Sequence, residues 1–160
     1  MYTRCTHIHV QRGVSAVEAV VGVSLLAVIV LFSMQAISQF IGLGREQIVR
    51  TQAIFLTEEV LELTRFIRDD DWAAFDTFTD SSDTFYLHIS PTGPSLSTTA
   101  TSTDAFTTAI RFYDVSRTSG SNDITTSGGS SDDETTYMVA TTTWSGGSVT
   151  LAQYLANIHE

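Results

Sequence analysis

The stretch Gln11-Arg12-Gly13-Val14-Ser15-Ala16-Val17-Glu18 leads into an apolar run that continues to Leu43. Between Val14 and Leu43 the only ionisable side chain is that of Glu18. As an α-helix this run would extend about 45 Å, which exceeds the ~30 Å hydrocarbon core of a bilayer. Apolar residues occur on all of its sides, so it has no polar face to turn toward water. The sequence therefore predicts a membrane-spanning helix with one carboxylate near its start, where an unpaired charge is costly to hold in hydrocarbon.

Length and composition allow one modest domain beyond this helix. The chain has 160 residues, a formal net charge of -10 and no lysine. Such an acidic surface repels phosphate backbones, so binding to nucleic acid is not expected. The only cysteine is Cys5, which leaves the chain beyond residue 13 without a thiol that could form an internal disulfide.

The segment 45–68 has the spacing of an amphipathic helix. Its apolar residues recur at steps of three and four, which places them on one face that we expect to pack on a sheet. They are Val49, Ala53, Leu56, Val60, Leu63 and Ile67. The charged residues lie largely off this stripe and indicate a solvated face with local ion pairs rather than an acid pair or a metal site. They are Glu58, Glu59, Glu62 and Arg65. The acidic run 69–71 opposes the helix dipole and predicts a helix end before Trp72.

The remainder of the chain alternates β-branched and aromatic runs with segments rich in Ser, Thr, Asp and Gly. We expect one strand within a surface loop over 73–104, three later strands, and an exposed loop over 118–136. The expected strands are 85–90, 106–116, 137–144 and 148–158. Alternation places Ile110 and Phe112 on a buried face of the second strand and Val115 on the opposite face. The last two strands are joined by Ser145-Gly146-Gly147-Ser148, a strong hairpin signal.

These elements predict an α+β fold: a long N-terminal helix, with a membrane-spanning half and an amphipathic half, packed on a small antiparallel sheet. Residues that could support catalysis are sparse. The histidines outside the first 13 residues are His88 and His159, and neither stands in a nucleophile elbow or a zinc spacing. The acidic run 132–134 lacks the ligand spacing of a calcium loop. We therefore expect no enzymatic activity, no metal and no cofactor.

Gly13, the hydrophobic Val14 and Glu18, five residues past the glycine, resemble the N-terminal motif of the type IV pilin superfamily. A second stretch, 55–72, resembles the helix that many minor pilins carry after their membrane segment. The resemblance implies that a prepilin peptidase cleaves after Gly13 and methylates the new amine of Val14. It implies four parts: a leader, a hydrophobic helix, the amphipathic half of that helix, and a β-sheet head. Their bounds are 1–13, 14–44, 45–72 and 73–160.

The function implied is that of a minor pilin, a structural subunit of a type IV pilus or related filament. If cleavage exposes the Val14 amine, the Glu18 carboxylate lies about one helical turn away and can also pair with the amine of a neighbouring helix. The expected partners are the membrane, other pilin subunits, the prepilin peptidase and the assembly machinery. The head would lie outside the cytoplasm, first at the cytoplasmic membrane and then in a pilus or in a periplasmic or extracellular filament.

Two alternatives remain open from the sequence. One is a pseudopilin of a type II secretion or DNA-uptake apparatus, which would share the same motif. The other is an uncleaved single-span membrane protein with an exposed binding domain, because apolar length alone does not separate a filament subunit from a plain anchor.

Overall fold

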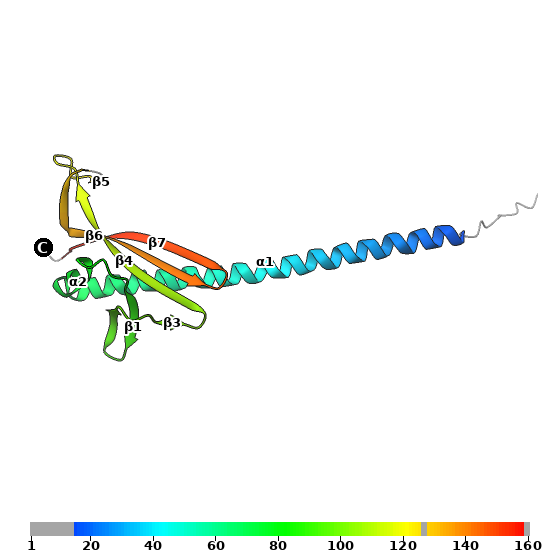
Figure 1. The fold of residues 1–160 in the computed structure, drawn as a ribbon, viewed down its shortest axis with the longest axis horizontal. Coiled ribbons are helices and arrows are strands. Elements are labelled where there is room, and N and C mark those ends of the chain that lie inside the picture. The colour runs from blue at the N-terminus through cyan, green and yellow to red at the C-terminus, as the bar shows by residue number, and fades with distance from the viewer. Residues whose placement is uncertain (1–14, 126–127, 159–160) are drawn as a thin grey trace, which may run out of the picture. The chain divides into compact units, whose positions relative to one another are not determined.

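The computed structural model describes residues 15–125 and 128–158, and its longest element is the helix α1, Ala16–Asp70 (Figure 1). The chain divides into two compact units, Met1–Arg45 and Glu46–Glu160. In the first unit every described residue is exposed, and α1 continues as an α-helix through Gly42 and Gly44. Within the described part of the chain, α1 is the one helix long and apolar enough to cross a membrane. The predicted hydrophobic helix is thus present.

The second unit is an α+β fold in which the C-terminal part of α1 packs against antiparallel sheets, as the sequence predicts. A five-stranded sheet has the order β3-β4-β6-β7, with β5 also paired to β4, and β1 and β2 form a separate two-stranded sheet. The strands are β1 Tyr86–Ser90, β2 Gly93–Ser97, β3 Ser102–Thr103, β4 Phe106–Arg117, β5 Ile124–Thr125, β6 Ser130–Trp144 and β7 Gly147–Ala156. Each of the four expected strands is present, although β6 begins seven residues earlier than expected.

The core of this unit lies between α1, a short helix α2 (Trp72–Thr79) and the sheets. Phe75 is fully buried and meets Phe112 of β4 edge to face, with ring centroids 5.4 Å apart. The ring centroid of Phe85 lies 5.9 Å from that of Phe112 and 5.4 Å from that of Phe78. The aromatic cluster therefore joins α2 to the large sheet, and such pairs add to the free energy of apolar burial.

The buried face of α1 differs from the predicted stripe in its centre. Ala53 and Val60 are buried as expected, but Thr57 and Thr64, which the predicted stripe did not include, have no exposed surface. Each threonine hydroxyl donates to the carbonyl four residues earlier, at 2.7 Å. This local bond satisfies the polar atom, and so threonine can occupy an apolar interface.

The segment after α1 is not the loop with a single strand that the sequence indicated. α1 ends at Asp70, and Asp71 is the N-cap of α2: its backbone is extended and its carboxylate accepts from Ala74 N at 3.1 Å. An aspartate at this position satisfies an otherwise unpaired helix N–H. The expectation that the acidic run only terminates a helix was therefore incomplete. The residues that follow also include β2 and the short β3.

Two further expectations about the sheet were wrong. Val115 is buried, because a β-bulge between Asp114 and Val115 shifts the register of β4 against β6 and reverses which side chains face the core. The segment 118–136 is not one exposed loop, since it holds β5 and the first residues of β6, which pair with the end of β4.

The predicted final hairpin is confirmed. Trp144 pairs with Gly147, so Ser145 and Gly146 form a two-residue turn between β6 and β7. A Cβ added at Gly146 or Gly147 would come within 3.0 or 3.2 Å of the Trp144 ring, which lies against the turn. A larger residue at either position would require the Trp144 ring to move by a few tenths of an ångström.

Candidate functional site

Glu18 lies in the first turn of α1 and is exposed. Its neighbours Val17, Val20 and Val21 are 71%, 65% and 52% exposed. Within residues 15–125 and 128–158, Glu18 makes no hydrogen bond or ion pair. Gly13 and Val14, the expected cleavage and methylation sites, lie outside the described residues. The structure therefore places the Glu18 carboxylate in the first turn of the apolar helix, exposed and without a partner among the described residues.

The apolar half of α1 presents large side chains all round. Leu25, Leu31, Phe32 and Phe40, for example, are between 60% and 74% exposed. An exposed apolar surface of this extent marks a contact with membrane or protein, because soluble monomers rarely present one. Glu18 is the only ionisable group on this surface before Arg45.

Further along α1, a chain of three threonine hydroxyls joins the helix to the sheet. Thr57 Oγ1 lies 2.7 Å from Thr142 Oγ1 on β6, and Thr142 Oγ1 lies 2.8 Å from Thr108 Oγ1 on β4. Thr57 and Thr142 are completely buried. We call these three residues the threonine chain. Sequence reasoning missed it, because hydroxyl pairing depends on a register between segments 85 residues apart.

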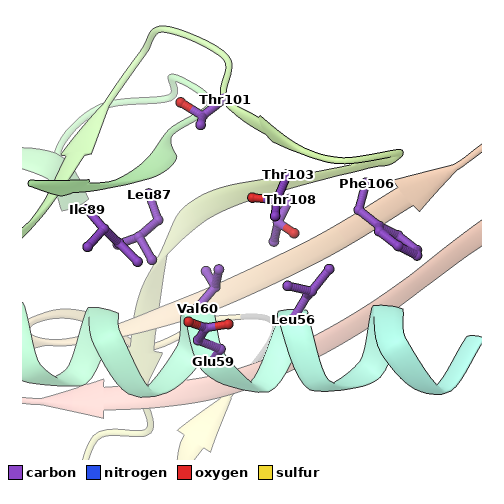
Figure 2. A pocket seen from close by; sticks show the side chains of 9 residues that line it. All are labelled: Leu56, Glu59, Val60, Leu87, Ile89, Thr101, Thr103, Phe106 and Thr108. Atoms are coloured by element: carbon purple, nitrogen blue, oxygen red, sulfur yellow. The ribbon is translucent and has the colours of Figure 1, made fainter. Parts of the chain in front are cut away.

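A groove lies beside the threonine chain, between α1, β1 and the β3–β4 hairpin. Figure 2 shows Leu56 and Val60 of α1 pointing toward side chains of those strands, with Glu59 beside them on the helix. The groove encloses about 330 Å³. Its lining residues are Leu56, Glu59, Val60, Leu87, Ile89, Thr101, Thr103, Phe106 and Thr108. No sequence pattern indicated this groove, because it forms only where the separate elements meet.

Asp132, a half-buried acidic residue of the head, is held by hydrogen bonds from its neighbours. Asp132 on β6 accepts from Arg117 Nε at 2.5 Å, and Arg117 also donates to Thr135 Oγ1 at 3.1 Å. Burial raises the pKa of Asp132, but the hydrogen bonds from Arg117, Thr135 and Glu134 outweigh this effect and hold the pKa of the carboxyl below its ordinary value. The carboxylate therefore stays ionised and joins β6 to β4.

The remaining candidates for chemistry are also engaged in structure. His88 Nε2 lies 2.7 Å from Thr101 Oγ1 and 3.0 Å from the Thr99 carbonyl oxygen. These two contacts join β1 to the loop after β2. His159 lies outside the described residues. In the part of the chain that the structure describes, no group of three His, Cys, Asp or Glu side chains is placed to hold a metal ion.

Comparison of the chain with protein-family models, with curated proteins and with solved structures finds no match. What the chain does is therefore inferred from its own chemistry. Two features carry the inference: a lone carboxylate at the start of an exposed apolar helix, and a sheet domain packed on the amphipathic part of that same helix.

Proposed function

We propose that the chain is a membrane-anchored filament subunit, a minor pilin of the type IV pilin kind, cleaved after Gly13. The observation that supports this most is Glu18 in the first turn of α1, followed by an apolar surface with no other ionisable group before Arg45. In a plain membrane anchor a carboxylate there would lie at the headgroup level in water, where it interacts favourably with the helix N-terminus; deeper in hydrocarbon an unpaired charge raises the free energy of insertion.

Glu18 gains a role if copies assemble through their helices. A carboxylate in a low-dielectric bundle costs several kcal/mol unless a cation lies beside it. Cleavage after Gly13 would create such a cation at Val14, both in the same chain and in each neighbour. Pairing then removes the cost and fixes how far one helix is displaced along the next. The peptidase and the assembly machinery are partners in this proposal.

The arrangement of the second unit supports the same proposal. The amphipathic part of α1 is covered on one face by the sheet, through the threonine chain and the aromatic core, so the head is built directly on the helix that carries the anchor.

The intact mass and N-terminal sequence of the protein from its native membranes test the cleavage step. We expect a chain that begins at a methylated Val14, and a Gly13→Ala variant that keeps the leader. A native protein that retains Arg4 and Arg12 would reject the filament proposal and favour an uncleaved single-span protein with an exposed binding domain.

The role of Glu18 is tested separately by the amount of the protein in the sheared filament fraction. Glu18→Gln and Glu18→Val are expected to reduce incorporation at least tenfold, because neither can pair with an amine. Glu46→Gln is the matched control: it removes the same charge from an exposed site just beyond the apolar run. Equal incorporation of the Glu18 and Glu46 variants would contradict the pairing.

A further inference from the structure

The groove beside α1 combines an apolar lining with one charged group. Leu56, Val60, Leu87 and Phe106 are buried or half-buried and supply the apolar surface, and Thr101, Thr103 and Thr108 add hydroxyl groups. Glu59 is exposed at its edge and is the only ionisable residue in the lining (Figure 2). A site of this composition suits an apolar side chain that carries, or lies beside, a positive charge.

Glu59 differs from its neighbour Glu62 in having no partner. Glu62 Oε1 accepts from Arg65 Nη1 at 2.6 Å, whereas Glu59 accepts no hydrogen bond and forms no ion pair within the described residues. The groove therefore holds an available carboxylate next to unoccupied apolar surface.

The chain itself has a matching element on α1. It has no lysine, and each arginine from Arg65 onward donates a side-chain hydrogen bond within its own chain. Among the described residues, Arg45 and Arg50 are the arginines that donate none. Arg45 stands three residues before Ile48, which is 60% exposed, so the two side chains are neighbours on one helix face.

We propose that the groove binds α1 of a second copy of this chain, with Ile48 in the apolar lining and Arg45 beside Glu59. Arg45 and Glu59 are fourteen residues apart in α1, which is too far for a side-chain pair within one helix. The pair therefore joins two copies. This contact rests on the proposed assembly of copies. Between parallel helices it requires a displacement of fourteen residues, whereas a Glu18–Val14 pair requires four, so the two contacts join a copy to two different neighbours.

Cysteine cross-linking in the native membrane tests the contact. In a Cys5→Ser background the chain has no other cysteine, so an Ile48→Cys copy and a differently tagged Ile89→Cys copy can form one heterodimer only. Ile89 is 69% exposed at the groove. The control replaces Ile89→Cys with Tyr154→Cys, a residue 50% exposed on the sheet face opposite the buried Leu155. We expect at least fivefold more heterodimer from the Ile89 pair, and equal yields would overturn the proposal.

A charge exchange tests the role of Glu59. Glu59→Arg in the Ile89→Cys copy should reduce the heterodimer several-fold, and Arg45→Glu in the Ile48→Cys copy should restore it. Glu58→Arg is the matched control, since Glu58 is exposed on the same helix, carries the same charge and does not line the groove. A Glu59→Arg variant that cross-links like Glu58→Arg would overturn the assignment.

The N-terminal mass of the same samples separates this proposal from the filament proposal. A chain that is cleaved after Gly13 but forms no specific heterodimer rejects the groove contact alone. A chain that keeps its leader but still forms the heterodimer supports the groove contact and rejects the cleavage pathway.

Discussion

Replacing Thr142 with valine removes the central hydroxyl of the threonine chain and changes little else in its shape. Thr142 has no exposed surface, and its Oγ1 lies 2.7 Å from Thr57 Oγ1 and 2.8 Å from Thr108 Oγ1. Valine is as branched as threonine and suits a strand. Each lost hydrogen bond contributes about 0.5–1.5 kcal/mol, so we expect the variant to lose about 1–3 kcal/mol of unfolding free energy.

Urea unfolding of the full chain in detergent micelles, followed by the fluorescence of Trp72 and Trp144, measures this loss. The control is Thr150→Val, which removes an exposed hydroxyl that lies 3.0 Å from Thr141 Oγ1 on the outer side of the sheet. An exposed substitution of this kind should change stability by less than about 0.5 kcal/mol.

A double variant identifies the cause. If the Thr57–Thr142 hydrogen bond causes the loss, the double variant Thr57→Val with Thr142→Val should lose clearly less unfolding free energy than the two single variants together. The reason is that the second substitution removes a hydroxyl whose partner is already absent. Additive losses, or a Thr142→Val variant as stable as Thr150→Val, would refute the role we give to this bond.

Three other changes probe the head by the same unfolding measurement. Phe75→Ala should lower the unfolding free energy by about 3–5 kcal/mol, because it leaves a cavity where a fully buried side chain of α2 contacts the sheet. A loss below about 1 kcal/mol would place Phe75 outside the core. Asp71→Ala should cost about 1 kcal/mol through loss of the α2 cap, while Asp70→Ala, one residue earlier, should cost less. Asp132→Asn should cost about 1 kcal/mol at neutral pH. The folded pKa of Asp132 lies below its unfolded value, so its contribution is complete above the unfolded pKa and is lost as pH falls through the folded pKa. The difference between Asp132→Asn and the native chain should therefore shrink in acid, and a difference that grew would contradict the sign.

Elements with a strong sequence period were predictable. The apolar run and the amphipathic stripe fall within α1, and the Ser145-Gly146 turn closes the final hairpin. In each case the signal is local, because period and turn chemistry depend on residues near one another in the chain.

The features that the sequence did not reveal depend on contacts between distant segments. Thr57 and Thr64 are polar residues that become buried where α1 meets the sheet, and Thr57 Oγ1 also lies 2.7 Å from Thr142 Oγ1, 85 residues away. The burial of Val115 departs from simple alternation along β4 because of the bulge after Asp114, and that bulge arises from the pairing of β4 with β6. The groove at Glu59 likewise needs α1, β1 and the β3–β4 hairpin to be brought together. Each depends on register, which the hydrophobic pattern of one element does not specify.

The two parts of α1 differ in what covers their apolar side chains. Beyond Arg45 the helix satisfies its apolar face with its own sheet, and it can do so with threonine hydroxyls because each finds a partner. Before Arg45 no described residue of the chain covers it, and the only charge on it is Glu18. A lipid bilayer can cover the apolar side chains but offers the carboxylate no fixed cation, whereas a bundle of identical helices with free N-terminal amines covers both. The same reasoning applies to Glu59 in the head, where an available carboxylate again adjoins uncovered apolar surface. The two proposed contacts between copies would give each carboxylate a cation, a terminal amine for Glu18 and Arg45 for Glu59.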